Sequence, residues 1–380
     1  MEQRHPLPAS AAVTDLAALL PREECVWEIL KNTDRPIVLY GTGNGGDKLI
    51  DALAKIGRTP DGVFASDGFV RSRTFHDMPV QSLADAEKQF GHDMIILCAF
   101  GSSLPDVMDH MRWLSRNYTF FMPELPLYGG DLFDYPYFSA HIDALNRAYA
   151  SLSDDRSRKL FCQTILYRLS GRIDYLETTE TFENSLASLL RTDAVRTALD
   201  GGAFTGDTAR DMLRVFPNLD TLLAAEPDER TFRKLSAFAK EREDTVFPVH
   251  CALSDMVGTY TFSSSGSRGS GIDGRNKRAK TVEIPANTVD SLCRDLTLDL
   301  LKLDIEGEES AALRASCETV RRDRPALAVS LYHRSEDLFS LTAQVSDMCG
   351  DGYSYHLRRV PCFPCWDLVL YAVPDRLKKA

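Results

Sequence analysis

Two acidic side chains and one histidine have the types and positions needed to move a proton. Asp304 and Glu306 stand two residues apart in "KLDIEGEE", where they would share one face of a strand end before Gly307 interrupts it. His333 ends the next predicted strand, "PALAVSLYH". Histidine titrates near neutral pH, and a carboxylate beside it orients the ring and raises its basicity. We therefore predict that these three residues converge at one sheet edge, with His333 as general base or acceptor-positioning residue.

The same three side chains allow two other interpretations. Two carboxylates and an imidazole suit a divalent cation such as Mg²⁺ or Mn²⁺, but three ligands on strand ends are not diagnostic, and we predict no metal. Alternatively, His333 only caps a strand, and Glu306 and Glu308 are solvated. Lys302 points to the opposite face from its neighbours, and we expect it to be structural.

A glycine-rich turn, "DGGAFTG" (200–206), follows an apolar strand and precedes a helix. In an open parallel sheet, ligands lie beyond the carboxyl ends of the strands, and glycines there let the backbone come close to them. Glu226 ends the next strand about 20 residues on, where a carboxylate can accept both ribose hydroxyl protons. The pattern predicts an adenosine-type ligand, which leaves NAD, FAD and S-adenosylmethionine open. The alternative is that these glycines serve packing alone.

A second glycine-rich turn lies far upstream, in "LYGTGNGGDKLI". Gly41, Gly43 and Gly46 match G-x-G-x-x-G after a strand, and Asp67 ends the following strand. By pattern alone this turn would suit NAD(P), so an NAD(P)-dependent oxidoreductase or epimerase is an alternative function. Against it, the chain has no Tyr-x-x-x-Lys pair, which supplies acid and base in the short-chain dehydrogenases.

Strands and helices alternate along the chain in two regions, which predicts two α/β domains, both Rossmann-like. The first region has strands at 36–40, 62–66 and 93–100, a short apolar stretch at 78–80, and helices at 45–57 and 82–90. The second has strands at 195–200, 221–228, 245–253, 298–307 and 325–333, a hairpin at 353–373, and helices at 181–190, 207–216 and 229–241. We predict an N-terminal helical segment (1–35), a Rossmann-like domain (36–123), a helical connector (124–179) and a second domain (180–380). Ser153 is the expected N-cap of the connector helix and Gly171 its stop.

The second region resembles the FkbM family of S-adenosylmethionine-dependent methyltransferases. The matching pieces occur in order as "DGGAFTGDT", "EPD", "ALSD", "NTVDSL", "LLKLDIEGEE", "LYH" and "DLVLYAVP". The resemblance implies a class I methyltransferase fold, whose seven-stranded sheet has an antiparallel last strand. It also implies methylation of an oxygen on a sugar, glycan or related natural product. A non-catalytic sugar-nucleotide-binding protein is the third alternative, although the intact motifs speak against lost activity.

The resemblance also implies which residues hold the cofactor. The turn would face its methionine end, Glu226 its ribose, and the segment after the third strand its adenine. In this chain that segment contains Ala252 and Leu253. The family commonly has Asn just before this Ala-Leu pair, where the chain has His250 and Cys251. The implied cofactor-binding residues are Asp200, Gly202, Ala203, Gly206, Glu226, Ala252, Leu253 and Asp304.

Two further segments bear on the acceptor. The loop "SSSGSRGSGIDGRNKRAK" is basic in an acidic protein, so Arg268, Arg275 and Lys277 are candidate ligands of an anionic acceptor, with a solvated loop as the alternative. The upstream turn resembles the sugar-nucleotide-binding domain of some bacterial sugar-modifying acyltransferases. That resemblance implies a sugar-nucleotide or glycan site, or a docking and dimerisation domain.

Composition excludes several classes of function. The 380 residues carry a net charge of −11, which argues against nucleic acid as a partner. No segment reads as a secretory signal or membrane span, and the nine cysteines are odd in number, which predicts reduced thiols in the cytoplasm. Cys362 and Cys365 form a lone CxxC without a second pair, which favours thiols over zinc. The expected partner is a small-molecule or glycan substrate, and a homo-oligomer is an open alternative.

Overall fold

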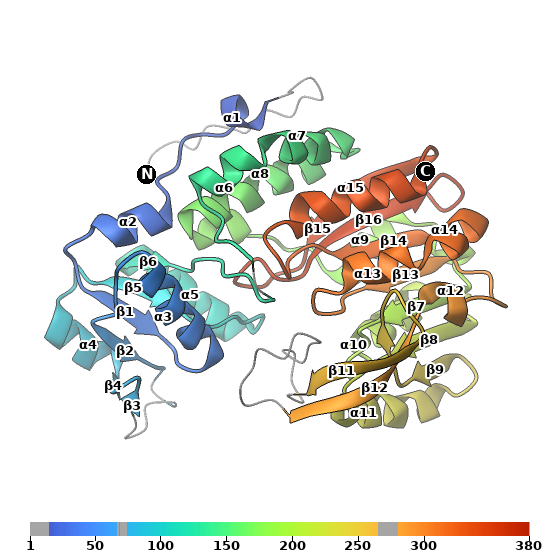
Figure 1. The fold of residues 1–380 in the computed structure, drawn as a ribbon, viewed down its shortest axis with the longest axis horizontal. Coiled ribbons are helices and arrows are strands. Elements are labelled where there is room, and N and C mark those ends of the chain that lie inside the picture. The colour runs from blue at the N-terminus through green and yellow to red at the C-terminus, as the bar shows by residue number, and fades with distance from the viewer. Residues whose placement is uncertain (1–14, 67, 69–73, 129, 265–279, 380) are drawn as a thin grey trace.

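The computed structural model describes residues 15–66, 68, 74–128, 130–264 and 280–379. Two parallel-dominated sheets lie on opposite sides of the molecule, with helices between and around them (Figure 1). This is the α/β architecture that the alternating pattern predicts.

The N-terminal sheet is doubly wound. Over the described residues it has six strands in the order β3-β4-β2-β1-β5-β6, all parallel except β3, which is antiparallel to β4. Strands β1 and β5 are buried along their whole length, as expected for parallel strands covered on both faces. The strands are β1 (Ile37–Tyr40), β2 (Gly62–Phe64), β3 (Thr74–Phe75), β4 (Met78–Gln81), β5 (Ile95–Cys98) and β6 (Thr119–Phe121); the helices are α1 (Leu16–Leu19), α2 (Val26–Asn32), α3 (Asn44–Lys55), α4 (Leu83–Phe90) and α5 (Pro105–Asn117).

The C-terminal sheet has the predicted topology. Seven strands within the described ranges follow the order β15-β16-β14-β13-β7-β8-β9, and the last strand of the chain, β16, runs antiparallel to both of its neighbours. A small sheet, β10-β12-β11, projects beside it (Figure 1). The strands are β7 (Thr197–Gly201), β8 (Thr221–Ala225), β9 (Val246–Val249), β10 (Ala252–Leu253), β11 (Gly258–Ser264), β12 (Lys280–Asn287), β13 (Leu300–Leu303), β14 (Ala326–Ser330), β15 (Tyr353–Arg359) and β16 (Leu368–Pro374).

Helices cover this sheet in the pattern that its crossovers require. The helices are α9 (Phe182–Leu189), α10 (Asp207–Val215), α11 (Glu229–Ala239), α12 (Val289–Leu292), α13 (Glu309–Arg314), α14 (Cys317–Asp323) and α15 (Asp337–Cys349), with short 3₁₀ turns η3 (Thr192–Ala194) and η4 (Lys240–Arg242). The apolar residues at positions 209 and 212 of α10 are buried at helical spacing.

The connector is helical, as predicted, but its N-cap differs. It comprises α6 (Tyr135–Ala140), α7 (Ile142–Ser151), α8 (Asp155–Ser170) and η2 (Ile173–Leu176). Asp154 caps α8 by accepting from the Ser157 N–H at 2.6 Å. The predicted cap, Ser153, is wrong because its hydroxyl instead accepts from the Tyr355 N–H at 2.7 Å and ties the helix to β15. Gly171 ends α8 in a left-handed conformation, as predicted.

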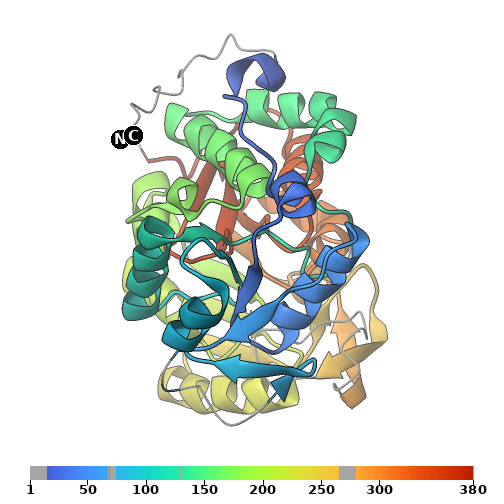
Figure 2. The ribbon, with the colours of Figure 1, turned by 90° about the vertical axis from the view of Figure 1, so that its left-hand side faces the viewer.

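The two sheets and the connector share one hydrophobic core. A single cluster of buried side chains joins Tyr40 and Ile96 of the first sheet, Phe161 of α8, and Leu301 of β13. In the rotated view, α7 and α8 lie above the N-terminal sheet, and the C-terminal strands lie behind them (Figure 2). The relative placement of the two sheets is therefore fixed by packed side chains as well as by the chain itself.

Candidate active site

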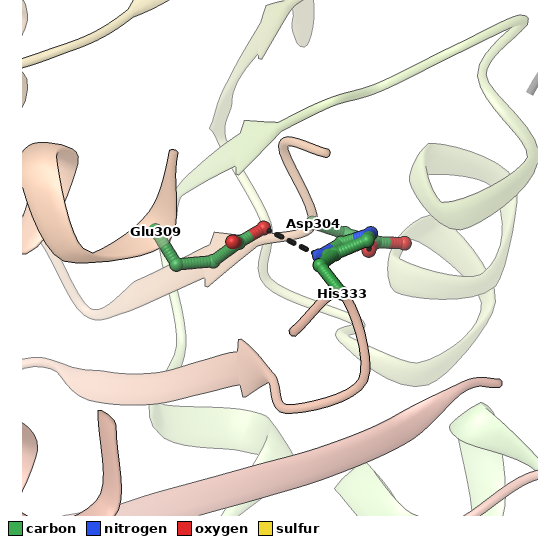
Figure 3. Close-up of side chains that lie close together, drawn as sticks. All are labelled: Asp304, Glu309 and His333. Carbon is green, nitrogen blue, oxygen red and sulfur yellow. Dashed lines mark ion pairs between the residues drawn. The ribbon is translucent and has the colours of Figure 1, made fainter. Parts of the chain in front are cut away.

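The carboxyl ends of β13 and β14 bring together the three residues singled out from the sequence. His333 Nε2 lies 3.5 Å from Asp304 Oδ1 and 3.7 Å from Glu306 Oε2. The imidazole is 1 % exposed, whereas the two carboxylates are each a little over one quarter exposed. A third carboxylate, Glu309, lies on the other side of the ring, with Oε1 3.1 Å from Nδ1 (Figure 3). We call Asp304, Glu306 and Glu309 the carboxylate cluster.

The loop after β13, not the strand itself, positions these carboxylates. The strand ends at Leu303, and Glu306 and Gly307 both have positive φ, +60° and +96°. Asp304 and Glu306 therefore do not share one face of a strand, because the chain turns between them. A left-handed conformation at a non-glycine residue is strained, and such strain is concentrated at functional sites. The Ile305 N–H donates to Glu309 Oε1 at 2.7 Å and stabilises this turn.

Glu309 belongs to the carboxylate cluster, but the sequence pattern did not single it out. It begins α13 and is buried, with 1 % of its side chain exposed. Its acidic neighbours in "EGEE" gave no reason to prefer it, because burial depends on how α13 packs. Its position in the first turn of α13, just after Gly307, could have indicated it. Side chains in a helix point back toward its N-terminus, which here lies near the strand ends.

The charges of the cluster set the protonation state of the histidine. Burial alone would lower the pKa of His333, but the negative charges of the carboxylate cluster, Glu309 first, outweigh burial and raise it to about 10. His333 is therefore an imidazolium at neutral pH. Burial raises the pKa of Glu306 to about 7, although the His333 charge and a hydrogen bond from Tyr128 oppose the rise. Glu306 is thus a carboxylate whose pKa lies near neutrality.

Asp304 stays ionised for a different reason. Burial raises the pKa of its carboxyl, but the positive charges of Lys302 and His333 more than offset this, so the pKa is lowered overall. The Tyr332 hydroxyl also donates to Asp304 Oδ1 at 2.8 Å. Asp304 and Glu306 therefore have pKa values shifted in opposite directions, which is typical of residues with separate roles in proton transfer.

Tyr128 reaches this site from outside the C-terminal sheet. It belongs to the crossing between β6 and α6, and its hydroxyl donates to Glu306 Oε2. Its ring packs edge-on against the His333 ring, with centroids 5.7 Å apart. The backbone of this segment also contacts the site, because the Leu127 N–H donates to the His333 carbonyl at 3.1 Å. The sequence showed only that this segment is rich in Pro, Gly and aromatic residues.

The metal alternative has a defined candidate group. One ligand atom each from Asp304, Glu309 and His333 lies within 4.8 Å of the others. The two carboxylates, however, approach different ring nitrogens, Nε2 for Asp304 and Nδ1 for Glu309 (Figure 3). A histidine binds an ion through one nitrogen. The contacts are therefore those of an imidazolium held between carboxylates.

The glycine turn after β7 packs directly against the carboxylate loop. Gly202 has φ +75°, and a Cβ there would overlap the Asp304 carbonyl oxygen, so only glycine fits. The Asp304 N–H donates to the Gly201 carbonyl at 3.1 Å. Gly206, also at positive φ, caps α10 and packs against Phe238. The turn and the carboxylate cluster thus lie at one edge of the sheet.

Asp200 lies beneath this turn and does not face outward. It is fully buried, with Oδ1 2.9 Å from the Lys302 ammonium. Lys302 also donates to the carbonyl oxygens of Gly201 and Gly202 at 3.2 and 3.0 Å. Lys302 therefore has the structural role expected of it, and with Asp200 it fixes the shape of the turn from below.

Glu226 links the turn to the tip of β8. Its Oε2 accepts from the Phe204 N–H at 2.9 Å, and its Oε1 accepts from the Asp228 N–H at 2.9 Å and the Thr231 hydroxyl at 2.8 Å. A carboxylate offers about four acceptor positions, so one remains, on Oε2. That leaves room for one ribose hydroxyl, where we expected two. Burial raises the pKa of Glu226 to about 7 despite these donors. The remaining acceptor position of Glu226 fits an adenosine ligand that donates one ribose hydroxyl to this carboxylate.

The segment expected near adenine is largely enclosed. Ala252 and Leu253 form β10 and are each 3 % exposed, so their side chains already pack against the protein. His250 lies more openly, where Asn is common in the family. Its ring stacks on Phe232 with centroids 4.5 Å apart, and its Nε2 lies 3.1 Å from the Pro227 carbonyl oxygen.

The upstream turn is packed tightly. A Cβ at Gly41 would contact the Phe100 ring, one at Gly45 would overlap the Ala99 carbonyl oxygen, and one at Gly46 would contact the Phe75 ring. Gly43, with φ +90°, has open space around it. Most of this fingerprint is therefore accounted for by close approach of α3 to its neighbours.

The remaining predictions from the sequence concern residues outside this site. Asp67, Arg268, Arg275 and Lys277 lie outside the described residues. Cys362 and Cys365 are both buried, and neither forms a disulfide bond. Among the helices that the structure describes, none is long and apolar enough to cross a membrane.

Comparisons with known proteins bear on the family and the fold. Residues 200–355 match the family model described as Methyltransferase FkbM domain. The crystal structure of a methyltransferase FkbM from Methylobacillus flagellatus KT is similar in fold, with a TM-score of 0.67 and 20% identity over 91% of this chain and 92% of that one. No curated protein matched the sequence.

Two further structures each match about half of this chain weakly. Fibrillarin from Aeropyrum pernix, in complex with natively bound S-adenosyl-L-methionine, has a TM-score of 0.31 and 15% identity over 48% of this chain and 67% of its own. An rRNA methylase from Streptococcus thermophilus has a TM-score of 0.32 and 12% identity over 50% and 93% of the two chains.

Proposed function

We propose that the protein transfers a methyl group from S-adenosylmethionine to a hydroxyl oxygen of a sugar, glycan or related natural product, because residues 200–355 match the family model described as Methyltransferase FkbM domain. One observation carries the proposal. The glycine turn that would hold the cofactor and the groups that would handle the acceptor proton meet at Asp304, whose backbone packs on Gly201 and Gly202. Cofactor and acceptor would therefore be neighbours.

The cofactor, when bound, supplies a methyl group already activated by a positively charged sulfur. The residues of this chain must then align the acceptor oxygen and take its proton. We assign the proton to Glu306, because a carboxylate with a pKa near 7 is an effective base at neutral pH. The acceptor oxygen gains the methyl group and loses its proton to this carboxylate.

His333 and Asp304 support that step. As a buried imidazolium, His333 cannot itself take a proton at neutral pH, so we assign it the positioning role. It lies against the carboxylates and keeps their oxygens at fixed places at the sheet edge. Asp304, held by the Tyr332 hydroxyl and by its own backbone contact with the turn, would face both the cofactor and the acceptor.

The proposed cofactor contacts follow the same geometry. Gly202, Ala203 and Gly206 form the turn, and Glu226 would accept one ribose hydroxyl. Ala252 and Leu253 would flank the adenine. Asp200 is proposed to act indirectly, through Lys302 and the turn carbonyls. For the acceptor, Arg268, Arg275 and Lys277 remain the candidate ligands of an anionic group.

The proposal is tested by methyl transfer itself. Purified protein is incubated with S-adenosylmethionine labelled in its methyl group and a panel of sugar nucleotides, free sugars and glycans. We expect label in at least one saccharide, removable by ether cleavage and not by mild base, because the new bond is an ether. Label recovered only on nitrogen or sulfur acceptors would contradict the oxygen assignment.

A further inference from the structure

The N-terminal glycine turn leads to a lysine that reaches the segment crossing between the two domains. Lys48 lies in the second turn of α3, and its ammonium donates to the carbonyl oxygens of Leu127 and Pro126 at 2.7 and 3.4 Å. Burial lowers the pKa of Lys48, while the negative charge of Glu306 acts in the opposite sense. Lys48 thus joins the helix after the turn to the crossing segment, close to the methyltransferase site.

The crossing segment is held against the methyltransferase site at several points. The Leu127 N–H donates to the His333 carbonyl at 3.1 Å, and the Ser335 hydroxyl donates to the Asp131 carbonyl at 2.9 Å. Before these contacts, Glu124 forms a buried ion pair with Arg168 of α8. We call residues 124–131 the strap.

Tyr128 is the strap residue that touches the proposed base. Its hydroxyl donates to Glu306 Oε2, and a Cβ on Gly307 would lie 3.4 Å from its side chain. Glu306 itself has the strained backbone of the site. A hydrogen bond at Oε2 fixes the carboxylate and leaves Oε1 to receive a proton. Tyr128 lies outside the matched domain, so the domain alone does not contain this group.

We infer that Lys48 and Tyr128 are positioning residues of the methyltransferase site, through which the N-terminal domain holds Glu306 in place. The inference rests on the proposed role of Glu306 as base. It gives the N-terminal domain a role that requires no bound nucleotide. The glycines of its turn allow α3 to pack closely on β5, and α3 then presents Lys48 to the strap.

The first test measures backbone hydrogen exchange by mass spectrometry in the full chain. Lys48→Met removes the ammonium but keeps the stem, so exchange in peptides covering 126–131 should become about tenfold faster, as expected for losing one charged hydrogen bond of ~1.4 kcal/mol. Lys55→Met, at an exposed position on the same helix, is the matched control and should leave the strap unchanged. Equal acceleration in β7 and β13 would indicate general destabilisation and would overturn the inference.

The second test follows the titration of Glu306 through the ¹³C shifts of the labelled His333 imidazole, which are assigned by their loss in His333→Gln. The charged and titratable groups that act on Glu306 are His333, Asp304, Glu309, Tyr128 and Lys48. His333 stays charged near pH 7, so a change in its shifts in that range reports the ionisation of Glu306. In Tyr128→Phe, Glu306 loses the hydrogen bond that favours its ionised form, so its pKa rises and this change moves to higher pH.

The double variant separates action through Tyr128 from independent effects. Lys48→Met should raise the pKa of Glu306 in the same direction as Tyr128→Phe, and the shift in the double variant should fall short of the sum of the two single shifts. Two effects that add in full, or no effect of Lys48→Met, would overturn the inference. Neither measurement uses methyl transfer. If no acceptor is ever methylated, the proposed function fails while these contacts can still be demonstrated, and the reverse also holds.

Discussion

At the scale of single residues, the site depends on how a buried histidine is charged. His333 lies between carboxylates that approach both of its nitrogens, and their charges outweigh the cost of burying an imidazolium. The sequence predicted the meeting of Asp304, Glu306 and His333 because parallel strands end at one edge. It could not give the charge state, which depends on Glu309 and on burial, neither of which is visible in a local pattern.

Replacing the histidine should separate catalysis from cofactor binding. In His333→Ala we expect S-adenosylmethionine affinity to stay within about twofold, because the ring contacts no residue proposed for the cofactor except Asp304. Methyl transfer should fall by about 10²-fold, because the carboxylate that takes the proton loses the charged ring that holds it in place. Calorimetry and a labelled-methyl assay measure the two quantities. A variant with unchanged turnover would remove His333 from the site.

The pH dependence of methyl transfer should have two limbs. Glu306 must be ionised to take a proton, so the rate should rise as pH passes through about 7. His333 must keep its proton to hold the carboxylates, so the rate should fall as pH approaches about 10. A rate profile measured with saturating cofactor tests both. A rate that is highest below pH 5 would contradict the assignment of Glu306.

At the scale of elements, the two glycine turns look alike in sequence but differ in what they require. Gly202 has a positive φ, and any side chain there would overlap the Asp304 carbonyl oxygen. Gly43 also has a positive φ, but nothing lies near its missing Cβ. Position in a motif therefore does not tell which glycine can be replaced.

This difference predicts unequal costs for the same substitution. Gly43→Ala meets backbone strain alone, which at φ +90° and ψ −157° costs about 1–3 kcal/mol. Gly202→Ala meets positive-φ strain and a backbone overlap as well, so it should lower the free energy of unfolding by more than Gly43→Ala does. Urea denaturation of the two variants gives the comparison. Similar midpoints for both would show that the turn after β7 does not pack as described.

The order of elements was predictable because buried parallel strands read as continuous apolar runs, such as "IIL" in β5 and "ALAV" in β14. The residues at which these helices and strands begin and end were not predictable in the same way. Ser153 looked like a helix cap, but a tertiary contact with β15 takes its hydroxyl, and Asp154 caps instead. Strand β13 is shorter than its apolar pattern because the strained turn at Glu306 begins just after it.

At the scale of the whole molecule, two sheets are joined at the site by a segment that belongs to neither. The strap brings Tyr128 to Glu306, and Lys48 reaches the strap from the first domain. No sequence pattern predicts this, because the contact between Tyr128 and Glu306 spans 178 positions. Within the described residues, the two sheets share one hydrophobic core.

We expect the turn after β7 and the tip of β8 to bind S-adenosylmethionine. Calorimetric titration tests it most directly, with NAD⁺ and NADP⁺ titrated in parallel and Glu226→Ala as the variant. We predict binding of S-adenosylmethionine, about tenfold or more weaker in Glu226→Ala because one hydroxyl contact is lost. Binding of a nicotinamide nucleotide without any binding of S-adenosylmethionine would contradict the account.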